Sequence, residues 1–233
     1  MKNFCFNGET VSTNTKSTTL KSLEAEYFRL ARQETSTAIK IQLDKLEAAI
    51  RHEKRLDSHP KDIKLIGISG KMKHGKDTFY DFIKQACPQA VRVAFADALK
   101  KEVAEACGVT VDFINANKDK FRTILQWWGT EFRRGLYGDD YWLRRLEDTI
   151  YKLPDGSVVF VTDVRFLNEA DFVRQMGGTV VKVVRIGGPE SAAGIAQHAS
   201  EMELEKINAE HTICAASLEE LKSIATMWWE KQK

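Results

Sequence analysis

From residue 63 onward, apolar runs of strand length alternate with longer segments in which apolar residues recur at helical spacing. This alternation predicts βαβ units, and therefore a parallel sheet between layers of helices. We expect strands over residues 63–69, 90–95, 157–162, 179–184 and 211–214. We expect helices between and after them, over residues 76–87, 96–107, 118–136, 141–153, 169–176 and 217–231.

The N-terminal part of the chain follows a different pattern. Residues 1–19 are rich in Ser, Thr and Asn and show no apolar period, which predicts a poorly ordered leader. Residues 20–56 carry apolar positions at helical spacing, which fits two helices or one long helix. Their apolar stripe either packs on the main core or forms a seam with a partner, and Ser-His-Pro at 58–60 predicts a linker. We therefore expect a leader with a helical extension over 1–62 and a main domain over 63–233.

The charge of the chain is nearly balanced, with 35 Lys and Arg residues against 33 Asp and Glu residues and a net charge of +2. This balance gives no electrostatic case for binding to nucleic acid or to a membrane surface, and it favours small-molecule partners. The four cysteines are too far apart for a metal knuckle or a disulfide framework, so we expect reduced thiols. No apolar stretch approaches the roughly 18 residues of a membrane span, and we expect a cytoplasmic location.

The stretch GKMKHGKDT, residues 70–78, follows the first predicted strand and opens the first predicted helix of the main domain. A glycine-rich turn in this place aims backbone N–H groups and a helix N-terminus at one phosphate-sized space. Gly70 and Gly75 permit the tight backbone path, and Lys76 can reach the β- and γ-phosphates of a nucleotide. The alternative is an ordinary glycine-lysine turn before a helix.

The pattern GxxxxGK[ST] is not fully met, because Asp77 stands where a Mg²⁺-binding hydroxyl belongs and Thr78 comes one position later. A carboxylate beside a triphosphate is repelled unless a cation or water lies between them. Asp77 is therefore expected to orient the waters of Mg²⁺, and Thr78 is the candidate for the missing hydroxyl.

The third predicted strand of the main domain ends in TDVR, which delivers Asp163 and Arg165 to the same sheet edge as the glycine-rich turn. Asp163 could hold Mg²⁺ through water or orient an acceptor phosphate, and Arg165 could neutralise the transferring group. Glu169 follows at a spacing that allows pairing with Arg165. The alternative is a structural salt bridge that caps the next helix. Lys100, after the second strand, faces either an incoming phosphate or solvent.

About sixty residues separate the second and third predicted strands, which is far more than a crossover needs. Helices inserted there would overhang the carboxyl edge of the sheet, where ligands bind in open α/β folds. Aromatic rings in this insertion can stack on a base, and its arginines can bind phosphate. The candidates are Trp142, Arg122, Arg133 and Thr130, whereas at least one of the adjacent residues Trp127 and Trp128 must pack inward.

From residue 63 to its end, the chain resembles the bacteriophage deoxynucleoside monophosphate kinases. The resemblance is carried by GKMKHGKDT, FADALK, WWGTEFRR, GDDYWLRRL, TDVRFLNEADF, HASE and SLEEL, in this order. It implies a P-loop kinase-like, three-layer α/β fold and transfer of the ATP γ-phosphoryl group to a deoxynucleoside monophosphate with Mg²⁺, in the host cytoplasm. It also implies that Lys73, Gly75, Lys76, Asp77 and Thr78 bind the ATP phosphates, and that Lys100, Trp142, Asp163, Arg165 and Glu169 surround the acceptor.

The sequence leaves two other functions open. Phosphomevalonate kinases also resemble this P-loop with Asp after Lys, which would keep the fold and change the acceptor. A nucleotide-dependent assembly ATPase would instead use residues 20–56 as its partner seam. A homodimer is compatible with each of these functions.

Overall fold

The computed structural model describes residues 16–31, 36–56, 62–188 and 199–232. Most of the predicted leader and the whole of the predicted linker lie outside these ranges. The chain divides into two compact units, 1–60 and 61–233. Within the described residues, no helix has the length and apolar content that crossing a membrane requires.

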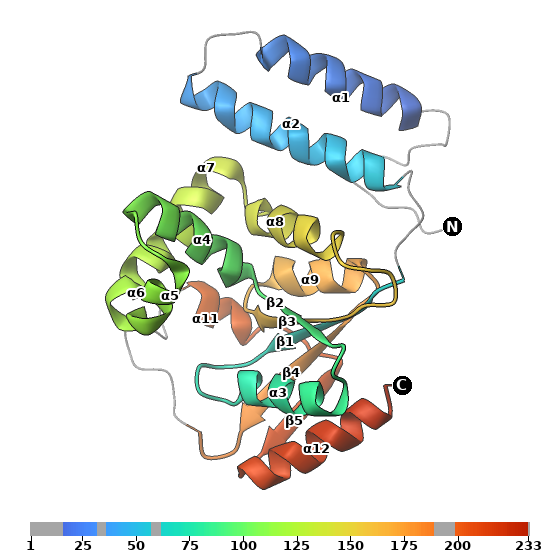
Figure 1. Ribbon diagram of the computed structural model, residues 1–233, viewed down its shortest axis with the longest axis vertical. Helices are drawn as coiled ribbons and strands as arrows, with labels where there is room; N and C mark the ends of the chain where they lie inside the picture. The colour runs from blue at the N-terminus through green and yellow to red at the C-terminus, as the bar shows by residue number, and fades with distance from the viewer. Residues whose placement is uncertain (1–15, 32–35, 57–61, 189–198, 233) are drawn as a thin grey trace. The chain divides into compact units, whose positions relative to one another are not determined.

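The described part of the first unit is a pair of helices, α1 (Lys16–Ala31) and α2 (Thr37–Leu56), which lie side by side in Figure 1. Polar side chains join the two helices. The hydroxyl of Tyr27 donates to Glu47 Oε1 at 2.9 Å, and Lys54 Nζ lies 2.8 Å from Glu24 Oε1. Of the two arrangements that the sequence left open, the structure adopts the helical pair.

The second unit is built on a five-stranded parallel sheet with the strand order β2-β3-β1-β4-β5. Its strands are rich in Val and Ile, as expected for strands that are buried on both faces. Each predicted strand is present, with ends that differ by a few residues. The strands are β1 (Lys64–Ser69), β2 (Val91–Val93), β3 (Val158–Val164), β4 (Thr179–Arg185) and β5 (His211–Ala215).

Helices connect the strands and cover both faces of the sheet. The connections up to β3 contain α3 (Lys76–Ala86), α4 (Phe95–Cys107), α5 (Val111–Ala116), α6 (Lys118–Trp127), the π-helix η1 (Trp128–Arg134), α7 (Gly135–Tyr137) and α8 (Tyr141–Ile150). After β3 follow α9 (Leu167–Gln175), α11 (Ala199–Leu204) and α12 (Leu218–Glu230). The sequence did not predict α5 or α11, and its single helix over 118–136 corresponds to α6, η1 and the start of α7.

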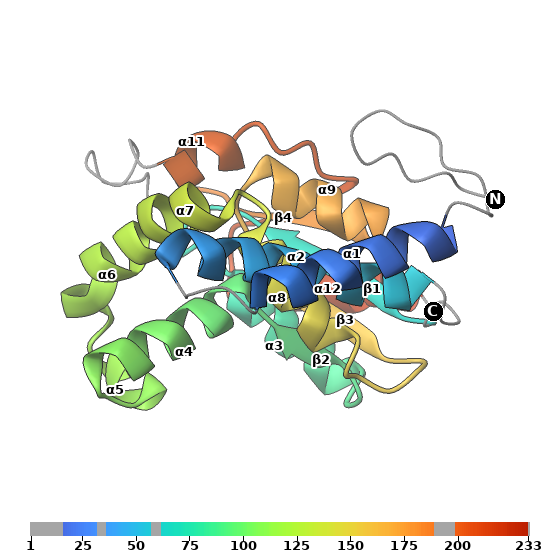
Figure 2. The same ribbon diagram turned by 90° about the horizontal axis from the view of Figure 1, so that it is seen from above.

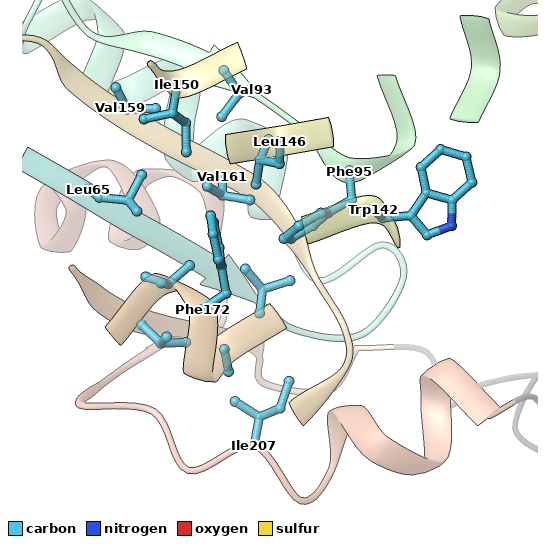
Figure 3. Close-up of a cluster of buried hydrophobic side chains, with 14 of the residues drawn as sticks. Leu65, Val93, Phe95, Trp142, Leu146, Ile150, Val159, Val161, Phe172 and Ile207 are labelled. Carbon is cyan, nitrogen blue, oxygen red and sulfur yellow. The ribbon is translucent and has the colours of Figure 1, made fainter. Parts of the chain in front are cut away.

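Two hydrophobic cores lie on opposite faces of the sheet. On one face, Val159 and Val161 of β3 pack with Leu146 and Ile150 of α8, as Figure 3 shows. On the other face, Phe160 packs with residues of α3 and α12. Successive residues of β3 therefore alternate between the two cores, and the three-layer α/β fold predicted from the sequence is confirmed.

The long insertion between β2 and β3 extends beyond the sheet. In Figures 1 and 2, α5 and α6 lie on the side toward which the strands run, and α11 lies on the same side. This is the carboxyl edge of the sheet.

Candidate functional site

The loop of residues 70–75 joins the buried end of β1 to α3, and its backbone restricts which residues it can contain. Gly70 has φ 141°, and a Cβ atom in its place would lie 2.4 Å from the carbonyl oxygen of Val183. Gly75 has φ 89° and caps α3 without a side chain. Lys73 takes φ 64°, which is uncommon for a residue with a side chain. Such backbone is typical of a loop that turns its N–H groups toward a ligand.

The ammonium group of Lys76 lies inside this loop. Its Nζ atom donates to the carbonyl oxygens of Gly70 at 2.6 Å and Lys71 at 2.7 Å. Lys76 also begins α3, whose first N–H groups have no partner within the helix and whose dipole favours an anion. Asp77 is exposed and Thr78 is partly exposed in the same first turn. A cation, helical N–H groups and two oxygen-bearing side chains are thus gathered at one point.

Other parts of the chain contact the loop. Lys71 Nζ lies 2.8 Å from Glu205 Oε1, just after α11, and the backbone N–H of Arg185 at the end of β4 donates to His74 Nδ1 at 3.3 Å. Arg122 Nη1 of α6 lies 3.7 Å from the sulfur of Met72. The insertion therefore reaches the loop, and Arg122, a sequence candidate, is placed beside it. Reasoning from the sequence gave His74 no role, although its position between the two glycines was the available signal.

Asp163, at the end of β3, holds the start of α4. Its two carboxylate oxygens accept hydrogen bonds from the backbone N–H groups of Phe95 and Ala96, each at 2.9 Å. Ala94, the N-cap residue, has no acceptor side chain, so Asp163 performs the capping from another strand. Burial raises the pKa of Asp163, while these two bonds and the nearby Arg165 act in the opposite direction. The alternative that the sequence left open, a salt bridge that caps the next helix, is present in Glu169: it accepts a hydrogen bond from the N–H of Phe166 at the start of α9 and pairs with an arginine, which is Arg134. Asp163 itself caps α4, which precedes it.

Lys100 and Arg165 lie within electrostatic reach of Asp163. Burial, followed by repulsion from Lys118, lowers the pKa of Lys100, and Asp97 and Asp163 oppose that change. Both cations are partly exposed. The edge of the sheet therefore presents two cations near one carboxylate.

Glu169 has a different partner from the one that its spacing suggested. Arg134 Nη2 donates to Glu169 Oε1 at 2.7 Å, and Arg165 contributes its backbone N–H, at 2.8 Å, instead of its guanidinium. The N–H of Phe166 also donates to Glu169 Oε2, at 3.2 Å. Burial raises the pKa of Glu169 to about 7, against the effect of Arg134. Because Glu169 is only 3% exposed and its carboxylate is occupied, the structure does not offer it to an acceptor.

Arg133 is held in a cluster of rings and a carboxylate. Its Nε atom donates to Glu102 Oε2 at 2.6 Å, and the same carboxylate accepts hydrogen bonds from Trp128 Nε1, at 3.1 Å, and from the hydroxyl of Tyr141. Burial and the bond to Glu102 raise the pKa of Tyr141 to about 12. The Arg133 guanidinium also lies over the rings of Trp128, Phe132, Tyr137 and Tyr141. Arg133 therefore anchors η1 to α4 in this structure.

Trp142 is part of the core, which contradicts the prediction that it stacks on a base. Its side chain is 4% exposed, and its Nε1 atom donates to the carbonyl oxygen of Gly129 at 2.8 Å. The cause is its place on α8, where it shares the inward face with Leu146 and Ile150, four and eight residues later (Figure 3). Trp128 packs inward, as expected of one of the adjacent pair, and Trp127 is 49% exposed.

Thr130 lies in η1, next to Gly129, and is partly exposed. Short π-helices are rare and often mark functional sites. The structure thus places Thr130 on a distinctive element of the insertion.

Comparison with known proteins identifies the family. The family model for deoxynucleotide monophosphate kinases matches residues 107–224. A protein of Acanthamoeba polyphaga mimivirus, described as a putative deoxynucleotide monophosphate kinase, is 30% identical over 169 residues, which are 61% of this chain and 83% of the relative. The chain belongs to the deoxynucleotide monophosphate kinase family.

The fold comparison is weaker. A crystal structure of a Thermus thermophilus protein matches with a TM-score of 0.47 and 14% identity, over 75% of this chain and 98% of the other. A likeness of this size adds nothing to the family assignment.

The family is the one that the sequence resembled. The bacteriophage origin that the resemblance implied stays a prediction. The range that the family model matches includes η1, Asp163, Arg165 and Glu169. It begins after the loop of residues 70–75, so a role for that loop depends on its geometry.

Proposed function

We propose that this deoxynucleotide monophosphate kinase transfers the γ-phosphoryl group of ATP to the 5′-phosphate of a deoxynucleoside monophosphate, giving a diphosphate and ADP. The observation that carries the proposal is the loop of residues 70–75, which encloses the Lys76 ammonium at the N-terminus of α3. In a family of nucleotide kinases, a cationic turn at the carboxyl edge of a parallel sheet is the expected binding site of the donor phosphates.

The donor phosphates would bind along the loop. Gly70 and Gly75 let the backbone approach them, and Lys73 and Lys76 supply positive charge. Lys76 would exchange its two carbonyl partners for oxygens of the β- and γ-phosphates, because the opposite charges of an ammonium and a phosphate attract each other more strongly than an ammonium and a neutral carbonyl do.

The first turn of α3 has ligands of the type that Mg²⁺ prefers. Mg²⁺ takes oxygen ligands and retains several of its waters. The exposed carboxylate of Asp77 fits contact with those waters, and the hydroxyl of Thr78 fits direct coordination. When bound there, Mg²⁺ would neutralise charge on the β- and γ-phosphates.

The acceptor phosphate would lie near Asp163, between Lys100 and Arg165. An acceptor oxygen attacks the γ-phosphorus, the bond from that phosphorus to the β,γ-bridging oxygen breaks, and ADP leaves with the bond electrons. Phosphoryl transfer needs positioning and charge stabilisation more than a covalent nucleophile, and two cations around an ordered carboxylate serve both needs. Arg122, beside the loop, is a further cation on the donor side, and Thr130 is the candidate contact for the nucleoside.

Family membership favours this function over the two alternatives. A nucleotide kinase binds a nucleotide acceptor, unlike the phosphomevalonate kinases. It also consumes ATP by transfer to a small molecule, unlike an assembly ATPase.

An acceptor screen tests the proposal. The full chain is incubated with ATP, Mg²⁺ and each of dAMP, dCMP, dGMP and dTMP, with the ribonucleotides in parallel, and the diphosphate products are separated by chromatography. We expect ADP and a deoxynucleoside diphosphate in equal amounts, and loss of both on chelation of Mg²⁺. ATP hydrolysis that proceeds equally without any acceptor would contradict the proposal.

A further inference from the structure

Two consecutive arginines of η1 are paired with carboxylates from two different helices. Arg133 Nε lies 2.6 Å from Glu102 Oε2 of α4, and Arg134 Nη2 lies 2.7 Å from Glu169 Oε1 of α9. The second pair is buried, with side-chain exposures of 8% for Arg134 and 4% for Glu169. The π-helical turn is therefore tied to α4 on one side and to α9 on the other.

The buried pair also fixes the turn that carries Arg165. Glu169 accepts hydrogen bonds from the backbone N–H groups of Arg165, at 2.8 Å, and Phe166, at 3.2 Å. The guanidinium of Arg134 lies 3.8 Å from the centroid of the Phe166 ring, and its Nη1 atom lies 3.5 Å from Asn168 Oδ1. Arg134 thus contacts this turn directly, and contacts it a second time through Glu169.

On the other side of η1, the contacts of Arg133 lead through α4 back to β3, the strand that precedes Arg165. Glu102 belongs to α4, the helix that carries Lys100. The N-terminus of α4 is capped by Asp163 of β3, and Arg165 follows the end of β3 by one residue. A closed circuit of contacts therefore joins the two cations of the acceptor side through η1.

A buried ion pair is a poor source of stability, because removing two charges from water costs about as much as their attraction returns. An apolar pair of similar volume would hold η1 and α9 together equally well. An apolar pair would leave the backbone N–H groups of Arg165 and Phe166 without the carboxylate that accepts their hydrogen bonds. The planar guanidinium of Arg134 in turn holds that carboxylate in place. The chemistry of the pair therefore fits orientation of the turn better than adhesion.

We propose that Arg134 is a positioning residue of the transfer reaction: through Glu169 and Phe166 it fixes the turn from which Arg165 meets the acceptor phosphate. This inference rests on the proposed function. In the proposed reaction, Arg134 does not contact the reacting atoms. A displacement of about 1 Å of a group that orients a substrate can cost on the order of 100-fold in rate.

Three variants test the inference. Arg134→Met leaves the buried Glu169 carboxylate without its cationic partner. Arg134→Lys keeps the positive charge but lacks the planar guanidinium. The double variant Arg134→Met/Glu169→Gln removes both charges. Arg174→Met is the matched control, because Arg174 lies on α9, the helix of Glu169, and pairs with a carboxylate, Glu210, at 2.7 Å, but its side chain is 32% exposed and lies at the other end of the helix from the turn. We measure kcat, both KM values, thermal unfolding, and hydrogen exchange of residues 163–169 by mass spectrometry.

We expect Arg134→Lys to fold, to lose about tenfold or more in kcat, to raise the acceptor KM, and to leave the ATP KM unchanged. The double variant should recover thermal stability relative to Arg134→Met without recovering kcat. Hydrogen exchange of residues 163–169 should be faster in every Arg134 variant and unchanged in Arg174→Met.

Wild-type kcat and acceptor KM in Arg134→Lys would overturn the inference. So would recovery of kcat together with stability in the double variant, because the role would then be structural. The exchange measurement separates this failure from failure of the proposed function. If the wild-type chain phosphorylates no nucleotide, the proposed function fails, and unchanged exchange in the variants would still overturn the control of the turn by Arg134.

Discussion

Lys76 Nζ donates to the carbonyl oxygen of Gly70 at 2.6 Å, so the cation at the start of α3 is bound by the first residue of its own loop. A second bond, to the carbonyl of Lys71 at 2.7 Å, completes the arrangement. The ammonium is thereby held at the N-terminus of α3. Because the lysine side chain is already ordered, it loses less conformational entropy when a phosphate binds.

We predict that Lys76→Met lowers kcat by about 100-fold or more, because the charge that develops on the transferring group loses a fixed cation. The far-ultraviolet circular dichroism spectrum should stay that of the wild type. Steady-state kinetics with saturating acceptor measures the effect.

Lys84→Met is the matched control. Lys84 lies in the last turn of the same helix and donates to the carbonyls of Pro88 and Ala90, each at 2.7 Å. Its loss should change stability and leave kcat unchanged. Equal losses of kcat in the two variants would show that Lys76 serves only the fold of α3.

The loop also predicts a difference between two glycines. Gly70→Ala brings a Cβ atom within 2.4 Å of a backbone oxygen at φ 141°, whereas Gly108→Ala meets no atom within 4 Å at φ 65°. The second change should cost about 1 kcal/mol for backbone conformation alone. The first should cost more than that in free energy of unfolding, measured in urea, and should weaken ATP binding. Equal costs would mean that the loop relaxes without loss around the added atom.

Much of the fold was predictable because it depends on local pattern. Short β-branched runs such as Val158–Val164 admit few alternatives to a buried strand, and the glycine-rich turn has a recognisable spacing. Strand ends were less certain. The second strand stops at Val93, because Phe95 already begins α4 under the cap that Asp163 supplies.

The acceptor side could not be predicted in the same way, since its contacts join residues far apart in sequence. Asp163 bonds a backbone N–H group 68 residues earlier, and Glu169 pairs with Arg134, 35 residues earlier. Spacing alone favoured Arg165 as the partner of Glu169. Aromatic content alone likewise suggested a base for Trp142, although its i, i+4, i+8 relation to Leu146 and Ile150 indicated the core.

Because Trp142 is buried, we expect its substitution to lower stability and leave the acceptor KM unchanged, whereas a ring that stacks on a base would raise the acceptor KM. Trp142→Phe loses the bond from Nε1 to the carbonyl of Gly129, and should cost about 1–3 kcal/mol in free energy of unfolding. Both KM values should stay within about twofold of the wild type. Trp127→Phe, at an exposed position, is the control and should change stability little. Unchanged stability of Trp142→Phe with a raised acceptor KM would instead place the ring against the base.

The buried carboxyl of Glu169 predicts how stability depends on pH. Its pKa rises from 4.5 to about 7 on folding, chiefly through burial, so the folded chain binds more protons than the unfolded chain between these values. The contribution is fully present below pH 4.5 and is lost as the pH rises through 7. We expect the free energy of unfolding of the wild type to fall, relative to Glu169→Gln, by up to about 1.4 kcal/mol per pH unit between pH 5 and 7.

Urea unfolding of both proteins at pH 5, 6, 7 and 8 measures this difference. Asp163, whose pKa is also raised by burial, titrates in both proteins and largely cancels from the comparison. A difference that stays constant over this range would show that Arg134 and the two backbone N–H groups outweigh burial and keep Glu169 ionised throughout.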